Sequence, residues 1–331
     1  MTHLKSVILL LLTTILIWSS SNAQTFGNEW IDYSQSYYSI KIVNDGVYRI
    51  DSAALANAGV PISLISTENF QLFGREKEVP LHIVDGGDSS LDGSDYILFF
   101  AKRNDGWLDS SIFVDPTTLA SPGMSLYNDT IQYFFTWNNS VSNLRYLVEN
   151  DSDFLSYTPA THFMSLVKTN FTNEYYEGEK SDKITSSFFV PGEGWGRAKV
   201  NGVPGGLTLT PTLSNPLRYA GTDAADAELL ALCVSASNAP PLSTSNPYNH
   251  HLRLRIGNSA TVIQDTIFYG YQQIKTIAMV PPSELGVSAT PFYFDIIDDL
   301  SVSTDFQSYT YYQWRYSHQP NFGGAPKLQF S

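Results

Sequence analysis

Hydrophobic and polar residues alternate along much of this chain. Apolar side chains occupy alternate positions from Tyr38 to Ile42, and a second run follows from Val47 to Ile50. A period of two is typical of a β-strand with one buried face. Asn44-Asp45-Gly46 stands between the runs, and this tripeptide favours a tight reversal. The pattern therefore predicts a β-hairpin over Ser36–Asp51.

A short helix is expected directly behind this hairpin. Asp51 and Ser52 can cap a helix over Ala53–Ala58. Gly59 suits the position after the last turn, and Pro61 prevents extension.

Elsewhere, runs of aromatic and β-branched residues are broken by Gly, Pro, Asn and Asp, which predicts short strands. In the first half of the chain the predicted strands are Asn69–Gly74, Val79–Val84, Tyr96–Ala101, Ile131–Trp137 and Leu144–Glu149. In the second half they are Thr185–Val190, Leu207–Leu213, Leu229–Ser235, Leu252–Ile256, Thr261–Phe268, Lys275–Val280, Phe292–Ile297 and Tyr309–Tyr316.

These strands fall into two domains. An N-terminal β domain is expected over residues 24–150, and a second over residues 184–331. The polar stretch 151–183 between them is predicted to be a connector, in which the apolar run Phe163–Val167 forms a short helix or an added strand. Many short strands with long turns suggest sandwiches. The predicted fold is all-β, with two β-sandwich-like domains, the second of jelly-roll or galactose-binding-like type.

Residues 1–23 have the pattern of a cleavable export signal. Lys5 supplies the positive start, Val7–Trp18 is an apolar run, and Ser21-Asn22-Ala23 is a small-residue cleavage site. The alternative is an uncleaved anchor helix, which the polar residues directly after Trp18 disfavour. No later segment approaches the roughly 20 apolar residues of a membrane span. We therefore expect an exported protein that is extracellular, on the cell surface or associated with the outer membrane.

The charge excludes some partners. The chain has a formal net charge of −13 and no cluster of basic residues. Because binding to nucleic acid or anionic lipid depends on clustered Lys and Arg, neither is an expected partner. The single cysteine, Cys233, excludes a disulfide within the chain. It lies in an apolar run, 229–235, which favours a small core residue over a nucleophile.

An acidic loop is the best candidate for a ligand site. Asp85, Asp88, Asp92 and Asp95 lie within eleven residues and are separated by glycines and serines. Carboxylate oxygens are the ligands that Ca²⁺ prefers, although the spacing is not that of an EF-hand. The alternative is a solvated turn in which Asp and Gly serve the backbone. Calcium is the only cofactor that the sequence suggests.

Other candidates have simpler explanations. His250 and His251 are adjacent at a strand start and point to opposite faces, so they do not easily share a metal ion. Trp195, in a glycine-rich loop, can stack on a sugar, but with 20 Tyr, 19 Phe and 6 Trp many aromatic residues must fill cores. Glu193 with Asp298 or Asp299 suggests a glycosidase pair only if a cleft separates them appropriately.

Several blocks of sequence resemble a known family. They are YYSIKIVNDGVYRID (37–51), FQLFG (70–74) leading to EVPLHI (78–83), LDGSDYILFFAKRNDG (91–106), FFTW (134–137), GEGW (192–195) and DTIFYGY (265–271). Together they resemble the N-terminal, non-catalytic region of gingipain-type cysteine peptidases, notably the type IX secretion system sortases of Bacteroidetes-like bacteria.

The resemblance implies a β region that precedes a caspase-like peptidase domain with a His–Cys pair. None of those catalytic residues can be assigned here, because Cys233 lies in a predicted β-strand and α/β alternation is missing from the sequence. We therefore expect a forepart that scaffolds or presents a peptidase domain located beyond Ser331. That domain, secreted cargo and the outer-membrane secretion machinery are the expected partners. The alternative is a stand-alone surface module that binds carbohydrate or a partner protein.

Overall fold

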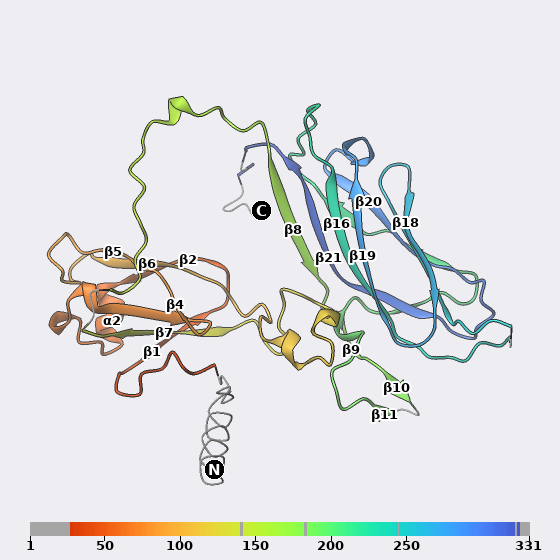
Figure 1. Cartoon of the computed structure of the whole chain (residues 1–331), viewed down its shortest axis with the longest axis horizontal. Helices are drawn as coiled ribbons and strands as arrows, with labels where there is room; N and C mark the ends of the chain where they lie inside the picture. Colours follow the sequence, from red (N-terminus) through yellow and green to blue (C-terminus); the bar gives the residue numbers. More distant parts are fainter. Residues whose placement is uncertain (1–26, 140–141, 182–183, 244, 322, 325–331) are drawn as a thin grey trace, which may run out of the picture. The chain divides into compact units, whose positions relative to one another are not determined.

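The computed structural model describes residues 27–139, 142–181, 184–243, 245–321 and 323–324. The predicted signal peptide and the last seven residues lie outside this part. The chain divides into two compact units, shown in Figure 1. Unit 1 contains the described residues up to Arg103 and Thr130–Glu149, and unit 2 contains Asn104–Asp129 and the described residues from Asn150 onward. In both units the regular elements are mainly β-strands, which confirms the predicted all-β fold.

Unit 1 contains two antiparallel sheets. The first has the order β1 (Tyr38–Ile42), β7 (Ile131–Trp137), β3 (Phe70–Gly74) and β4 (Lys77–Glu78). The second has the order β2 (Gly46–Asp51), β6 (Tyr96–Ala101) and β5 (His82–Val84). The two sheets contribute to one apolar core, whose fully buried side chains include Ile42, Phe70, Leu72, Ile97, Phe99 and Phe135.

The predicted hairpin over Ser36–Asp51 is wrong, although both of its strands exist. β1 pairs with β7, and β2 pairs with β6 in the other sheet. Neither Asn44 nor Asp45 has the positive φ that a two-residue hairpin turn requires. Ile42, at the end of β1, is completely buried. Crossing from one sheet to the other lets both strands contribute side chains to the same core.

A tight reversal of the expected kind lies elsewhere in unit 1. Arg75 and Glu76 have φ values of 53° and 63° and join β3 to β4.

The predicted helix is confirmed as α2, Ser52–Asn57, and Gly59 after it has a φ of 86°. In contrast, Leu144–Glu149 is not a strand, and its pairing is an isolated bridge between Arg145 and Leu81.

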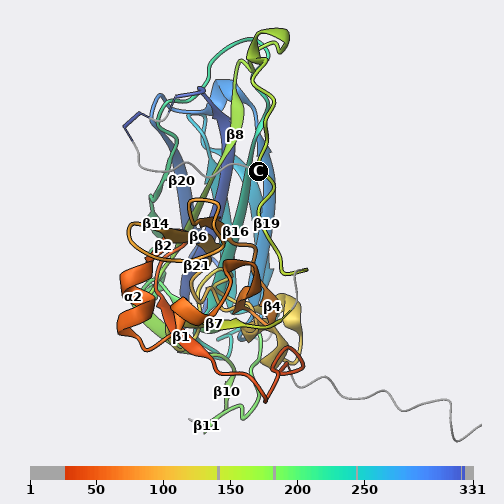
Figure 2. The same cartoon turned by 90° about the vertical axis from the view of Figure 1, so that its left-hand side faces the viewer.

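Unit 2 is built around two antiparallel sheets, seen in Figures 1 and 2. The first is here called the β16 sheet, and its central strand is β21 (Phe306–His318). On one side β21 pairs with β8 (Phe163–Asn170) and β13 (Val200–Asn201). On the other side it pairs with β16 (Ala227–Ser235), and β16 pairs in turn with β19 (Gln273–Val280). In the second, the β17 sheet, β20 (Ala289–Ile296) pairs with β14 (Leu207–Leu209), β15 (Thr212–Ser214) and β17 (His250–Ile256), and β17 with β18 (Thr261–Phe268).

The inner faces of these two sheets form a single core. Trp314 from β21 and Leu229 from β16 are completely buried together with Leu252 and Leu254 from β17 and Phe294 from β20. This arrangement is that of a β-sandwich. The sequence predicted one strand over Leu207–Leu213, but β14 and β15 are separate because Pro211 has no N–H for the ladder.

Two segments before Ile184 belong to unit 2. Asn104–Asp129 belongs to unit 2 by its contacts, although the sequence placed it in the first domain. Within the predicted connector 151–183, β8 forms eight residue pairs with β21. Figure 1 shows β8 beside β21. The added strand is therefore an integral part of the β16 sheet.

Small elements complete the structure. Two-stranded pairs form between β9 (Glu174–Glu177) and β12 (Glu193–Gly196), and between β10 (Lys180–Ser181) and β11 (Ile184–Thr185). Single 3-10 turns lie at Ile62–Leu64, Thr67–Asn69, Asp109–Ile112, Pro116–Thr118, Phe154–Ser156 and Pro282–Glu284. Among the described residues, no helix has the length and hydrophobicity needed to span a membrane.

Candidate functional site

Strand β17 presents three basic side chains on the outer face of its sheet. Alternate residues from Leu252 to Ile256 point into the core, so the pleat turns His251, Arg253 and Arg255 outward. The neighbouring strands place carboxylates beside them, because Arg253 is in register with Asp265 of β18 on one side and with β20 on the other. The result is a row of alternating charges across the β17 sheet.

Arg255 forms a two-point ion pair in this row. Its Nε and one terminal nitrogen donate to the two carboxylate oxygens of Asp295, at 2.6 and 2.9 Å. The Thr208 hydroxyl donates to the same carboxylate at 2.7 Å. Burial disfavours the charged form of Asp295, but these hydrogen bonds outweigh burial and lower its pKa. The guanidinium also lies over the Tyr293 ring, 4.7 Å from its centroid, which fixes its position.

His251 connects two carboxylates that are far apart in the sequence. Its Nδ1 lies 2.8 Å from Asp299 Oδ1, and its Nε2 lies 2.7 Å from Asp265 Oδ1. Arg253 Nε donates to the other oxygen of Asp265 at 2.8 Å. Burial favours neutral His251, but the two carboxylates outweigh burial and raise its pKa. The hydrogen bond from His251 is the main reason that the pKa of Asp265 is lowered.

This geometry predicts a decrease in stability as the pH rises. Because the folded state raises the pKa of His251 above its ordinary value of about 6.5, its stabilising contribution is complete below that pH and disappears as the pH rises through the folded-state pKa. We expect the free energy of unfolding of the wild type, measured in urea, to fall as the pH rises above 6.5. In the His251→Gln variant, this pH-dependent part of the free energy of unfolding should be missing. Equal pH profiles for the two proteins would contradict the assignment.

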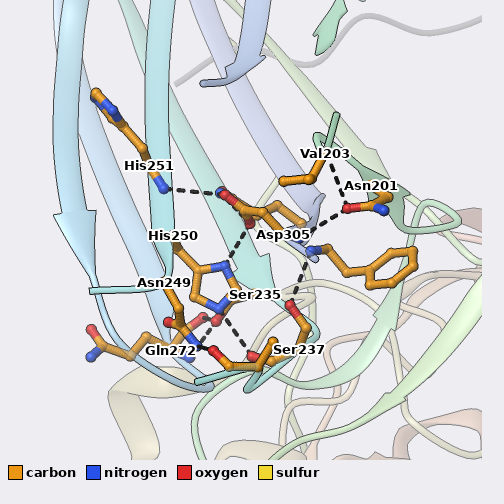
Figure 3. Close-up of polar contacts among 12 residues, drawn as sticks. Asn201, Val203, Ser235, Ser237, Asn249, His250, His251, Gln272 and Asp305 are labelled. Atoms are coloured by element: carbon orange, nitrogen blue, oxygen red, sulfur yellow. Dashed lines mark hydrogen bonds and ion pairs between the residues drawn. The ribbon is translucent and has the colours of Figure 1, made fainter. Parts of the chain in front are cut away.

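His250 points inward from the same strand and is completely buried (Figure 3). Its Nδ1 lies 2.6 Å from Asp305 Oδ1, and its Nε2 lies 2.9 Å from the Ser237 carbonyl oxygen. Gln307 Nε2 and the His251 main-chain N–H also donate to the Asp305 carboxylate. With both ring nitrogens engaged, His250 has none left for a metal ion. The pair anchors the segment before β21 to β17.

An open cavity of about 550 Å³ lies over the outer face of the β17 sheet. Its lining includes Arg253, Arg255, Asp295, Asp298, the loop residues 205–206 and the start of β14. The Gly205 N–H donates to Asp298 Oδ2 at 2.7 Å, which holds that loop in place. Donors from arginine and acceptors from aspartate line the same recess, so its chemistry suits a polar ligand that both donates and accepts hydrogen bonds.

Cys233 lies on the inner face of β16 and is 1 % exposed. Burial raises the pKa of its thiol far above the ordinary value, and burial is the one cause of the shift. A nucleophilic cysteine requires the opposite, a lowered pKa near a base. The location therefore matches the small core residue that the sequence indicated.

Three tryptophans, including the sugar-stacking candidate Trp195, serve packing. Trp195 in β12 packs edge-on against Tyr175, and its Nε1 donates to the Leu126 carbonyl oxygen at 3.2 Å. Trp314 is completely buried in the core of unit 2. Trp137 packs beside Tyr38 in unit 1. The Glu193 carboxylate accepts hydrogen bonds from the Tyr175 hydroxyl and the Val190 N–H, so it stabilises the local structure around β9 and β12.

The acidic loop of unit 1 joins β5 to β6, and its carboxylates are used mainly within the loop. Asp85 accepts hydrogen bonds from the Thr67 hydroxyl at 2.5 Å and the Gly87 N–H at 3.1 Å. Asp88 accepts from the Ser90 N–H, and Asp95 accepts from the Asp92 N–H. Such contacts are typical of Asx turns.

The structure does not bring the four aspartates together. In the part of the chain that the structure describes, no group of three or more His, Cys, Asp or Glu side chains is arranged to hold a metal ion. Calcium binding by Asp85, Asp88, Asp92 and Asp95 therefore stays a prediction. A calcium-dependent rise in melting temperature that Asp88→Ala with Asp92→Ala abolishes would support it, and an unchanged melting temperature would end it.

Comparisons with known proteins bear on the fold. No protein-family model and no curated protein matches the sequence. The fold is similar to that of PorU from Porphyromonas gingivalis. The crystal structure of dimeric latent PorU aligns over 89% of this chain with a TM-score of 0.50 and 12% sequence identity. The chain spans only 26% of that protein, and at this identity the similarity concerns the fold alone.

Two viral structures also align but support no argument. The structure of the infectious bursal disease virus Gx strain matches with a TM-score of 0.27 and 9% identity, and the VP2 subviral particle of that virus with 0.25 and 10%. Each alignment covers 89% of this chain and 74% of the viral chain. These TM-scores are too low for a shared fold to be inferred.

Sequence reasoning missed the partners of the two histidines. It noted His250, His251 and Asp299 but did not connect them, and it overlooked Asp305 as a site residue. In the sequence, Leu252, Leu254 and Ile256 alternate with Arg253 and Arg255, which predicts one packed and one solvated face, and the structure confirms this. An acid in a neighbouring strand, such as Asp265, was the available signal, since exposed basic residues in a sheet are commonly opposed by acids.

Proposed function

We propose that this chain is the non-catalytic N-terminal segment of a secreted, gingipain-like cysteine peptidase of the type IX sortase kind. In this proposal it scaffolds or presents a C-terminal peptidase domain that the chain itself does not contain. The observation that carries the proposal is the likeness in fold to PorU, which extends over 89% of this chain but only 26% of PorU. In fold, the chain therefore corresponds to a part of PorU and not to the whole of it.

Two further observations support the proposal. Sequence blocks in both units, including residues 37–51 of unit 1 and 265–271 of unit 2, resemble the family. The one cysteine is buried in the sandwich core with a raised pKa, which is incompatible with a peptidase nucleophile. We further propose that the protein is exported to the cell surface, where the peptidase domain, secreted cargo or outer-membrane machinery is its partner.

The proposal predicts that the purified chain has no peptidase activity. Cleavage of fluorogenic peptides with basic residues before the scissile bond should stay at the buffer rate, and Cys233→Ala should leave it there. Activity of the chain that Cys233→Ala abolishes would contradict the proposal. The complementary test is whether the reading frame continues past Ser331 into a segment with a histidine and a cysteine in an α/β context. A native protein whose intact mass ends at Ser331 would count against it.

The second candidate is a stand-alone surface module that binds carbohydrate or a partner protein. The polar cavity over the β17 sheet favours it, because side chains of Arg253, Asp295 and Asp298 can exchange hydrogen bonds with hydroxyl groups. A glycan array distinguishes the candidates. Binding that Arg253→Ala removes would support the module, and an array without hits would remove the carbohydrate version.

A further inference from the structure

The sheet edges of unit 2 differ in how they are protected against pairing with another chain. An edge strand exposes unpaired main-chain N–H and C=O groups, and natural proteins usually protect it with short length, charges or bulges. β13, β14 and β15 have two or three residues each. On β8 the one exposed residue is Lys168. β18 has an irregular register opposite Arg255, and Asp265 at its centre carries a charge.

β19 has little of this protection. It is eight residues long, pairs with β16 alone among the described strands, and keeps an unbroken register from Gln273 to Val280. Figure 2 shows it at the margin of the β16 sheet. Among the described residues, only those of β16 form main-chain hydrogen bonds with β19. Its outer edge is therefore a template for an additional strand.

The side chains of β19 specify what kind of strand would fit. Thr276 and Val280 are buried, so alternate residues turn outward. Of these, Ile277 is 60% and Met279 is 59% exposed. Ile277 lies opposite Leu230 of β16, which extends the apolar surface across the sheet. Such exposed apolar residues on a flat edge are uncommon in natural proteins, unless another chain covers them.

Lys275 supplies the charge that orients a partner. It is exposed, precedes Ile277 on the same face, and forms no ion pair with a described residue. In contrast, Arg253, Arg255 and Lys199 are each paired with a carboxylate. An acidic residue placed opposite Lys275 would complete the same kind of cross-strand pair. Every described pairing within the β16 sheet is antiparallel, which favours that direction for an added strand as well.

We propose that the outer edge of β19 binds an extended segment of a partner protein by antiparallel strand addition. From its N- to its C-terminus, this segment has apolar residues opposite Met279 and Ile277 and an acidic residue opposite Lys275. Main-chain hydrogen bonds supply the affinity, and the alternate side chains supply the specificity. The proposal is independent of whether the chain belongs to a peptidase.

A labelled peptide tests this proposal directly. The probe is the acetylated and amidated peptide Thr-Val-Thr-Val-Thr-Glu-Thr, and its binding to the full chain is measured by fluorescence polarisation. The double variant Ile277→Lys with Met279→Lys should weaken binding about tenfold or more, because it adds charge to the contact face. Both positions are exposed, so the variant should fold normally. The matched control is Ile267→Lys on β18, a substitution at an exposed apolar residue (42%) of another edge strand, which should leave binding unchanged.

Two altered peptides identify the binding mode. Methylation of the peptide amides that face β19 should abolish binding, since it removes the main-chain hydrogen bonds. The reversed order Thr-Glu-Thr-Val-Thr-Val-Thr should bind more weakly, because it places valine opposite Lys275. On addition of the first peptide, hydrogen exchange should slow in residues 273–280.

Several results would overturn the proposal. The first is that the unmodified peptide does not bind. The second is that the methylated peptide binds as tightly as the unmodified one. The third is that Ile267→Lys weakens binding as much as the Ile277→Lys, Met279→Lys variant does. Light scattering tests whether a second copy of this chain occupies the edge instead. If the free chain forms a dimer that the Ile277→Lys, Met279→Lys variant dissociates, a second copy occupies β19 and the proposed partner segment is excluded.

Discussion

Replacing Asp305 with alanine is expected to lower the free energy of unfolding by about 3–5 kcal/mol. The side chain of Asp305 is 2% exposed and that of its partner His250 is completely buried. Without the carboxylate, Nδ1 of His250 and Nε2 of Gln307 would remain in the interior with no acceptor. Urea denaturation followed by far-ultraviolet circular dichroism measures the loss.

Asp299→Ala is the matched control for this prediction. Asp299 also accepts a hydrogen bond from a histidine ring, but its side chain is 51% exposed. Water can replace that contact, so the variant should cost at most about 1 kcal/mol. Asp305→Asn keeps the shape and one acceptor, and we expect an intermediate loss. If Asp305→Ala and Asp299→Ala were equally mild, the buried pair would not anchor the segment before β21.

Replacing Trp314 with alanine is expected to destabilise unit 2 by about 3–5 kcal/mol. Trp314 lies on the inner face of β21, is completely buried, and belongs to the cluster that both sheets share. Its removal leaves a large cavity between two sheets that neighbouring side chains can fill only in part. The measurement is the urea midpoint of the full chain, monitored by tyrosine and tryptophan fluorescence and by circular dichroism.

Trp314→Phe separates packing from hydrogen bonding. The Trp314 Nε1 is buried and has no hydrogen-bond partner among the described residues. Phenylalanine removes this unsatisfied donor and keeps most of the apolar contact, so the loss should be clearly smaller than for alanine. Tyr33→Ala, at a position 80% exposed, should leave the midpoint unchanged. A loss in Trp314→Phe as large as in Trp314→Ala would show that the indole N–H is satisfied.

Much of the local structure could be predicted from the sequence. The strand over Thr261–Phe268 and the helix behind Asp51 agree with the structure within one residue at each end. Both depend on signals from adjacent residues: alternation for the strand, and capping and Gly59 for the helix. Errors appeared where a local signal competes with burial. Asn44-Asp45-Gly46 favours a hairpin, but Ile42 and the strands around it are better buried in two different sheets.

The candidate site was less predictable for the same reason. His251 meets Asp265 and Asp299, which are 14 and 48 residues away, and His250 meets Asp305, which is 55 residues away. No spacing rule connects such residues before the strand pairing is known. The Arg253–Asp265 pair follows only from the register of β17 with β18.

The sequence by itself determined that this protein is all-β, where most of its strands lie, and that Arg253 and Arg255 face outward. These properties follow from the two-residue period of a strand, which adjacent residues set. Only the tertiary structure decided that β1 and β2 belong to different sheets, that β8 joins β21, and that β19 is an open edge among the described strands. Pairing and register are determined by the joint burial of side chains from distant segments, which no local pattern records.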